Sequence, residues 1–152
     1  MRYCCRLETP WGSWHMTATE RGITSVDNQP LTGEESRNAC LDLAERELQA
    51  YFRGERKAFT VPLDPAGTAF QREVWNVLRE IPFGETLAYS QVAARMGRPA
   101  AARAVGQAVG RNPCLILIPC HRVMGKDGSL TGFSAGTELK IKLLALERQK
   151  EP

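Results

Sequence analysis

Residues that interrupt regular structure divide this 152-residue chain into two parts of different character. Pro62, Pro65 and Gly67 fall close together, and neither a helix nor a strand continues easily through such a cluster. The residues before the cluster have β-type patterning, whereas those after it have mainly helical periodicity. We therefore expect an α+β protein with one domain at 1–66 and a second at 67–152.

The first part has the signals of a small sheet and one helix. Three short runs separated by turn residues have β-type patterning, at 3–7, 14–19 and 23–26. Apolar residues recur with a helical period across 34–53, and Gly54 ends that pattern. A further strand is compatible with 58–63. The prediction is a small N-terminal α/β lobe with a short antiparallel sheet.

The second part is predicted to be mostly helical. Thr68 and Gln71 have the spacing of a capping box, so a helix is expected to start there. A short helix at 90–96 precedes Pro99, which favours the start of the next helix because its missing N–H needs no partner there. Two short helices joined by a tight glycine turn resemble a helix-turn-helix. A buried extended segment is expected at 115–118, and a last helix from 137 to about 147.

The second helix of this pair consists largely of small residues, which include Ala100, Ala101, Ala102, Ala104, Gly106 and Ala108. Small side chains let a backbone approach a binding partner closely. They suit close packing between two helices equally well. The composition alone leaves both interpretations open.

Charge is distributed unevenly along the chain, although the formal net charge is only +3. Residues 1–66 carry eight Lys/Arg and ten Asp/Glu, whereas residues 67–152 carry twelve and seven. No acidic residue occurs between Glu85 and Asp127, but this stretch contains Arg95, Arg98, Arg103, Arg111, Arg122 and Lys126. A basic, acid-free segment suits a polyanion such as nucleic acid, and it is also compatible with an ordinary solvated face.

The composition disfavours secreted, membrane and metal-stabilised classes. Five cysteines without framework spacing are expected to be thiols, and no apolar run approaches the ~18 residues of a membrane span. The N-terminal residues lack a signal-peptide pattern, so we expect a cytoplasmic protein without a membrane partner. We also expect a monomer. The residues Cys4, Cys5, Cys40 and His15 do not have a zinc-ligand spacing, and we expect neither a metal nor a cofactor.

Cys120 and His121 are the candidates for chemistry. They follow Pro119 at the end of the apolar run 115–118. A thiolate is a strong nucleophile, and a neighbouring histidine backed by an acid can take the thiol proton. A buried cysteine beside a packing histidine gives the same dipeptide, so the pair by itself leaves both interpretations open.

The longer segment 112–123 is much more specific, because its sequence NPCLILIPCHRV closely resembles the active-site signature of the O6-alkylguanine-DNA alkyltransferases, also called methylated-DNA–protein-cysteine methyltransferases. The resemblance extends from about Phe70 to Glu147 and includes IPFGET, AARAVG and GFS. Residues 1–66 fit the N-terminal lobe of the family in pattern only. The resemblance implies that 67–152 is a DNA-binding and alkyl-acceptor domain with a winged-helix or helix-turn-helix motif.

The resemblance also implies catalytic roles. Cys120 corresponds to the alkyl acceptor, and His121, linked to the thiol by a water and backed by Glu147, to the relay that forms the thiolate. Asn112 corresponds to the residue that braces the turn, and Tyr89 to a proton donor toward the guanine. From the residues alone, a surface glutamate is the more natural interpretation of Glu147. Asn112 is also explained as a turn former, and Tyr89 as a half-buried packing residue.

Contacts with DNA are implied by the same resemblance. Arg103 corresponds to the arginine that fills the gap left by an extruded base, and backbone contacts are expected from Gln71, Ser90, Arg98 and Lys126, for which an ordinary surface role is equally open. Phe133 and Ser134 correspond to the base pocket, where Phe133 replaces the usual tyrosine and lacks its hydroxyl.

The implied function is repair of double-stranded DNA. The alkyl group of O6-alkylguanine, and of O4-alkylthymine, would move to Cys120 once per molecule after the base has been turned out of the helix. A binding-only relative would lack the acceptor cysteine, and a transcription regulator would read bases with polar side chains. A Cys-His hydrolase remains a third possibility, which stable labelling of Cys120 would exclude.

Overall fold

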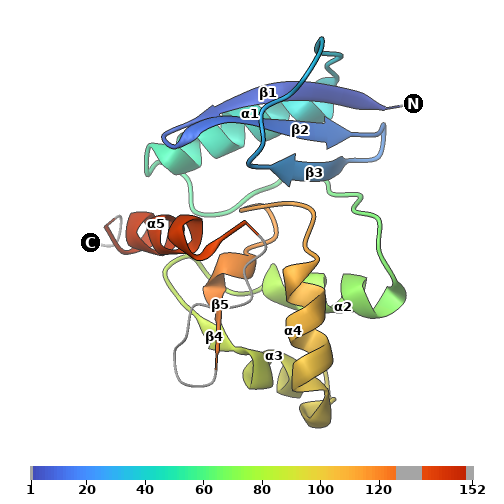
Figure 1. Cartoon of the computed structure of the whole chain (residues 1–152), viewed down its shortest axis with the longest axis vertical. Helices are drawn as coiled ribbons and strands as arrows, with labels where there is room; N and C mark the ends of the chain where they lie inside the picture. Colours follow the sequence, from blue (N-terminus) through green and yellow to red (C-terminus); the bar gives the residue numbers. More distant parts are fainter. Residues whose placement is uncertain (1, 126–134, 150–152) are drawn as a thin grey trace. The chain divides into compact units, whose positions relative to one another are not determined.

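The computed structural model describes residues 2–125 and 135–149, and the chain divides into two compact units. The N-terminal unit comprises residues 1–66 and 113–117, and the C-terminal unit comprises 67–112 and 118–152. The first unit combines a sheet with one helix, and the second unit is mainly helical, which confirms the α+β class (Figure 1). None of the helices within the described ranges is long and apolar enough to cross a bilayer.

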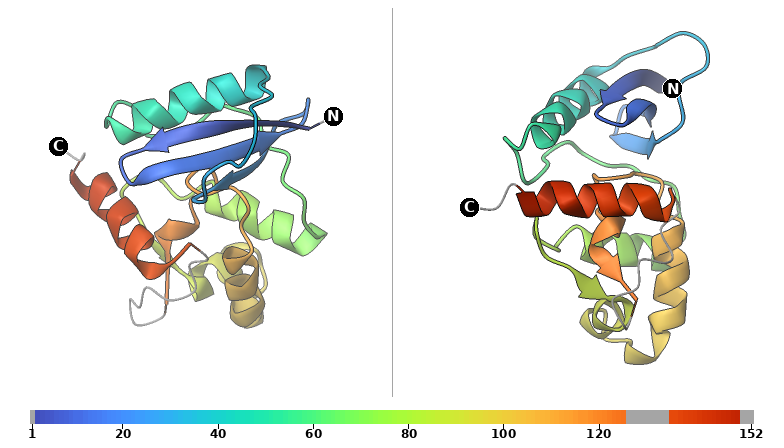
Figure 2. Two further views of the ribbon diagram at one scale, coloured as in Figure 1. Left: turned by 45° about the horizontal axis from the view of Figure 1, so that its top comes forward. Right: turned by 60° about the vertical axis from the view of Figure 1, so that its left-hand side comes forward.

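The N-terminal unit contains a three-stranded antiparallel sheet and one helix. The strands β1 (Tyr3–Thr9), β2 (Gly12–Ala18) and β3 (Ile23–Asp27) pair in the order β1-β2-β3. Alternate residues of the sheet point inward, and Leu7 and Met16 are fully buried. Helix α1 (Ala39–Phe52) packs along one face of the sheet (Figures 1 and 2). The predicted sheet and helix are therefore present.

Helix α1 begins later than the pattern over 34–53 predicts. The side chain of Asn38 accepts a hydrogen bond from Leu41 N and caps the helix. Ser36, just before the cap, exchanges two backbone hydrogen bonds with Cys4 on β1. Residues 34–37 thus satisfy their backbone groups partly at the edge of the sheet, which keeps them out of the helix.

The strand expected at 58–63 does not form. The backbone N–H groups of Thr60 and Val61 donate instead to the carboxylate of Glu47 on α1, at 2.9 and 3.1 Å. Leu63 alone of this segment makes a bridge, parallel to Ile23. The carboxylate of Glu47 accepts the backbone hydrogen bonds that a neighbouring strand would otherwise accept. The sequence of 58–63 alone does not reveal this.

The C-terminal unit contains four α-helices and several short elements among its described residues: α2 (Ala69–Leu78), β4 (Leu87–Ala88), α3 (Tyr89–Arg95), η1 (Pro99–Ala101), α4 (Ala102–Gly110), η2 (Cys120–Arg122), β5 (Val123–Met124) and α5 (Thr137–Gln149). The capping box of Thr68 and Gln71 is present at the start of α2, which confirms that prediction. Strands β4 and β5 pair in parallel (Figure 1).

Helices α3 and α4 form the predicted helix-turn-helix pair. Gly97 adopts a φ of +73° in the turn between them, a conformation that glycine tolerates best, and Pro99 starts the following 3-10 turn. Trp75 on α2 donates its indole N–H to the carbonyl of Ala108 at 2.9 Å and so fixes α4 from one side. The opposite side of α4, with Arg103, remains exposed.

The segment 115–118 is buried as predicted, but it is not extended. Leu117 N donates to Leu115 O at 2.7 Å, and Ile116 between them has a φ of +69°. A positive φ at a β-branched residue costs roughly 1–2 kcal/mol. A second tight turn follows, in which Cys120 N donates to Ile118 O at 2.7 Å around Pro119. These turns determine the direction in which the chain enters η2.

Candidate active site

Cys120 is the first residue of η2, and its side chain is almost completely buried, with 1% exposed. The side-chain amide of Asn112 donates to Cys120 Sγ at 2.9 Å and to Ile118 O at 2.8 Å. One amide therefore braces the turn and contacts the sulfur that follows it. The structure thus brings together the two residues that the sequence identified as nucleophile and turn brace.

Burial dominates the acidity of Cys120. Loss of solvation raises the pKa of the thiol to about 11, and the Asn112 hydrogen bond and the charge of Lys140 lower it in part. The thiol is therefore protonated near pH 7 in this state. Reaction at the sulfur requires a group that accepts the proton and an environment that stabilises the thiolate.

His121 forms a buried pair with Glu147. Its Nε2 lies 2.6 Å from Glu147 Oε2, and the two side chains are 0% and 1% exposed. Burial lowers the pKa of His121, although the hydrogen bond to Glu147 acts in the opposite direction. The ring is neutral near pH 7, and a carboxylate can only accept, so the ring proton is assigned to Nε2.

The other ring nitrogen of His121 is consequently an acceptor. Nδ1 is buried and has no hydrogen-bond partner among the described residues. A neutral imidazole with its acceptor nitrogen available can take a proton, and the carboxylate behind it stabilises the resulting imidazolium. The pair has the chemistry of a general base.

Arg122 is a component of this cluster that sequence reasoning missed. Its guanidinium donates to both carboxylate oxygens of Glu147, from Nε at 2.9 Å and from a terminal nitrogen at 2.9 Å, and it also donates to Ile81 O at 2.7 Å. Burial alone would raise the pKa of Glu147, but the bonds from His121 and Arg122 outweigh it and hold the pKa well below its usual range. Glu147 is thus fixed in its charged form.

Lys140 on α5 was also not identified from the sequence. It is 1% exposed and donates to Val123 O at 2.6 Å. The signal was available, because 140, 143, 144 and 147 follow the i, i+3, i+4, i+7 spacing of one helix face. Leu143 and Glu147 on that face are buried.

Tyr89 and Ser90 lie at the start of α3. Tyr89 is half-buried, and burial raises its pKa, which a thiolate at Cys120 would raise further. A Cβ built on Gly106 of α4 would lie 3.8 Å from the Tyr89 ring. The ring therefore packs against the small-residue helix, whereas Ser90 is exposed.

Arg103, Arg98 and Gln71 differ in how strongly the protein holds them. Arg103 is exposed on α4. Arg98 pairs with Glu73 at 3.5 Å and lies over the ring of Phe70 at 5.5 Å. The carbonyl oxygen of Gln71 accepts from its capping partner at 2.9 Å. Gln71 therefore has a structural role in addition to any contact with a partner.

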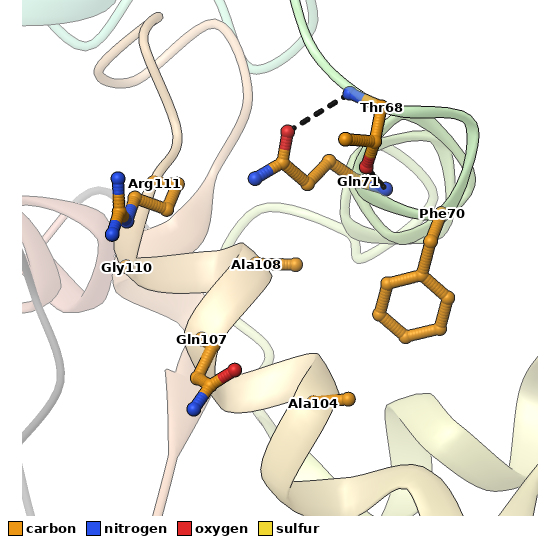
Figure 3. Close-up of a pocket in the computed structure, with 8 residues that line it drawn as sticks. All are labelled: Thr68, Phe70, Gln71, Ala104, Gln107, Ala108, Gly110 and Arg111. Carbon is orange, nitrogen blue, oxygen red and sulfur yellow. Dashed lines mark hydrogen bonds between the residues drawn. The ribbon is translucent and has the colours of Figure 1, made fainter.

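A hollow of about 620 Å³ lies between α2 and α4 (Figure 3). In the figure, the side chains of Phe70, Ala104 and Ala108 project from the two helices around it. Its lining residues also include Gln107 and Arg111, but they include none of the cluster around Cys120. The hollow is thus separate from the candidate chemistry.

Three predicted residues, Lys126, Phe133 and Ser134, lie outside the described residues. Among the described residues, no group of three or more His, Cys, Asp or Glu side chains is arranged to hold a metal ion. The expectation that the protein uses no metal or cofactor stays a prediction.

Family profiles match both parts of the chain. The profile described as "6-O-methylguanine DNA methyltransferase, ribonuclease-like domain" matches residues 3–65. The one described as "6-O-methylguanine DNA methyltransferase, DNA binding domain" matches residues 69–149.

Individual relatives agree with these profiles. A methylated-DNA–protein-cysteine methyltransferase of Mycolicibacterium paratuberculosis is 51% identical over 152 residues, which cover 96% of this chain and 92% of that protein. A protein of the same name from Methanosarcina acetivorans is 55% identical over 104 residues, or 68% of this chain and 67% of that protein. The crystal structure of Mycobacterium tuberculosis OGT in complex with DNA has a TM-score of 0.88 at 39% identity, covering 98% of this chain and 94% of that one.

Proposed function

Because this chain belongs to the 6-O-methylguanine DNA methyltransferase family, we propose that it repairs double-stranded DNA by moving the alkyl group of O6-alkylguanine to Cys120. The observation that carries the proposal is the buried cluster in which Cys120 contacts Asn112 at 2.9 Å and the neighbouring His121 contacts Glu147 at 2.6 Å. The residues proposed as nucleophile, turn brace and general base thus lie in one unit.

The transfer is a displacement at the alkyl carbon. The thiolate of Cys120 forms a C–S bond as the bond between that carbon and guanine O6 breaks, and the bonding pair remains on the guanine. The leaving guanine then takes up one proton, for which Tyr89 is the proposed donor, and the Tyr89 phenolate regains a proton from solvent as His121 releases the thiol proton to it. The product is a thioether, and none of the proposed groups cleaves a C–S bond. We therefore expect one transfer per molecule.

The proton of the thiol passes to His121. Neutral His121 offers Nδ1 as an acceptor, and Glu147 stabilises the imidazolium that forms. A water is the proposed link between the thiol and the ring. Asn112 donates to the sulfur and favours its anionic form.

The alkylated base must leave the stacked helix before Cys120 can reach it, at a cost of a few kcal/mol. Arg103, which is exposed on α4, is the proposed side chain that fills the gap. The neighbouring small residues of α4 suit a minor groove, where sequence is read weakly. Ser90, Arg98, Gln71 and Lys126 are the proposed backbone contacts, and Phe133 and Ser134 the proposed base pocket.

The proposal also covers the roles of the two parts of the chain, a second substrate, the oligomeric state and the location of the protein. Residues 67–152 carry DNA binding and the acceptor, and 1–66 form the accompanying lobe. O4-alkylthymine is a second substrate, since it also presents an alkyl group on an exocyclic oxygen. The protein acts as a monomer, without a metal or cofactor, in the cytoplasm, where its DNA substrate lies.

A titration of the protein with O6-methylguanine duplex tests the proposal. A known amount of protein is mixed with excess duplex, and the intact mass and the modified peptide are measured. We expect a gain of one methyl group on Cys120, one repaired guanine per protein and no reaction with Cys120→Ala. Turnover well beyond one equivalent, or transfer by Cys120→Ala, would refute the proposal.

The variant Arg103→Ala tests base extrusion separately. We expect much slower repair of the duplex, with little change in the reaction of the free base O6-benzylguanine, which needs no extrusion. Arg72→Ala, which removes an exposed arginine from α2, is the matched control. Equal slowing by both variants would contradict the role of Arg103. Labelled O6-benzylguanine also distinguishes alkyl transfer from hydrolysis. Alkyl transfer leaves the labelled benzyl group on Cys120 after denaturation, whereas a Cys-His hydrolase would release it.

A further inference from the structure

A buried lysine lies close to the chemistry without a role in the mechanism described above. Lys140 is 1% exposed, and its ammonium donates to Val123 O at 2.6 Å. Val123 directly follows η2, which begins with Cys120. The hydrogen bond therefore fixes the position of a positive charge relative to the turn that carries the nucleophile.

The buried charges of the C-terminal unit do not balance while Cys120 is a thiol. Its buried charged side chains, among the described residues, are Arg122, Lys140 and Glu147. Arg122 and Glu147 neutralise each other through two hydrogen bonds. No described carboxylate lies within ion-pair distance of Lys140. The cluster thus has one positive charge in excess.

A Cys120 thiolate would offset the charge of Lys140, and the net charge of the cluster falls to zero once His121 has passed the thiol proton on. The interaction between the two groups is mutual, since the charge of Lys140 lowers the pKa of Cys120 and a Cys120 thiolate raises that of Lys140. Burial acts against both charged forms, so each charge is favoured by the presence of the other. The other ionisable groups around this pair are Tyr89 from α3, His121 and Arg122 from η2, and Glu147 from α5.

We infer that Lys140 is the counter-ion of the Cys120 thiolate and that its bond to Val123 holds it in place for that purpose. This inference rests on the proposed function and deepens it. His121 removes the proton, whereas Lys140 supplies the fixed positive charge that remains beside the sulfur afterwards. A charge positioned before the reaction needs no rearrangement as the thiolate forms. Lys140 acts through Cys120 and is thus a positioning residue.

Three substitutions separate the charge of Lys140 from its hydrogen bond. Lys140→Gln keeps a donor but removes the charge, Lys140→Arg keeps the charge, and Lys142→Gln removes an exposed charge from the same helix as the control. Cys120 ionisation is followed by NMR of ¹³Cβ-labelled cysteine, with the signal assigned through Cys120→Ala. The second-order rate of alkyl transfer is measured across the same pH range.

We expect Lys140→Gln to raise the thiol pKa by about one unit and to slow transfer about tenfold at every pH below that value. Lys140→Arg should retain most of the rate, and Lys142→Gln should match the wild type. Slower transfer by Lys140→Gln with an unchanged thiol titration would overturn the inference, because that result is expected of a purely structural lysine.

A reciprocal measurement needs no substitution at Lys140 and covers the case in which those variants fail to fold. Linkage requires that removal of the Cys120 anion affect Lys140 equally. We expect the ¹³Cε signal of Lys140 to titrate at a higher pH in Cys120→Asp, which places an anion at that position, than in Cys120→Ala, and identical titration in the two variants would refute the pairing. These titrations use no DNA, so a coupled pair in a protein that repairs nothing would refute the proposed function alone.

Discussion

Nε2 of His121 lies 2.6 Å from Oε2 of Glu147, although 26 residues separate them along the chain. Both side chains are buried, and Arg122 donates to both oxygens of the same carboxylate. Glu147 therefore has two functions in the structure. It orients the histidine ring, and it neutralises a buried guanidinium.

The variant Glu147→Gln is expected to impair both functions. It leaves Arg122 buried without its counter-charge, which costs about 3–5 kcal/mol of unfolding free energy. It also removes the anion that stabilises a protonated His121, so the transfer rate should fall roughly 10²- to 10⁴-fold. Urea unfolding and single-turnover kinetics measure the two effects. Glu138→Gln removes an exposed carboxylate from the same helix and should change neither.

The depressed pKa of Glu147 predicts acid sensitivity. The bonds from His121 and Arg122 hold this pKa well below the roughly 4.3 of an unfolded glutamate. The stabilisation is therefore complete above about pH 4.3 and is lost as the pH falls through the folded-state value. Urea midpoints between pH 7 and pH 3, followed on amide signals of α5, should decrease more in the wild type than in Glu147→Gln. Parallel curves for the two proteins would contradict this prediction.

Asn112→Ala removes the amide that donates to both Cys120 Sγ and Ile118 O. A hydrogen bond to a charged group contributes about 1.5–3 kcal/mol. We therefore expect transfer to slow roughly 10- to 100-fold and the thiol pKa to rise further above about 11. The pH profile of the reaction measures both. Asn76→Ala, at an exposed asparagine of α2, is the control, and similar profiles for both variants would exclude this role of Asn112.

Gly22→Ala should destabilise the N-terminal unit. A Cβ at this position would lie 2.6 Å from Pro62 O, and that carbonyl is held by a 2.9 Å hydrogen bond from Ile23 N. Because backbone rather than a flexible side chain must move, we expect a loss of about 1–3 kcal/mol. Calorimetry measures it.

Gly106→Ala provides the contrast within α4. Its Cβ would meet the Tyr89 ring at an ordinary 3.8 Å. Replacement of a helical glycine by alanine should therefore stabilise the C-terminal unit by up to about 1 kcal/mol. Stabilisation by Gly22→Ala, or strong destabilisation by Gly106→Ala, would contradict this assessment of the space around the two glycines.

Local signals predicted most of the secondary structure. The capping box at Thr68 and Gln71, the proline that starts η1 and the glycine in the turn before it each involve residues within one helical turn. Their physics is contained in short stretches of chain, and so the sequence could reveal them. The strand predicted at 58–63 was wrong because the backbone N–H groups of Thr60 and Val61 donate to the carboxylate of Glu47, which lies on α1.

The sequence by itself determined the two-part α+β organisation, the helix-turn-helix pair and the Cys120-His121 segment through a long motif. The resemblance nominated Glu147, but the tertiary structure decided the 2.6 Å contact between Glu147 and His121, the place of Arg122 behind it and the burial of Lys140. These contacts join α5 to η2 across distant parts of the chain. Their energies depend on burial and on neighbouring charges, which exist only after the helices have packed.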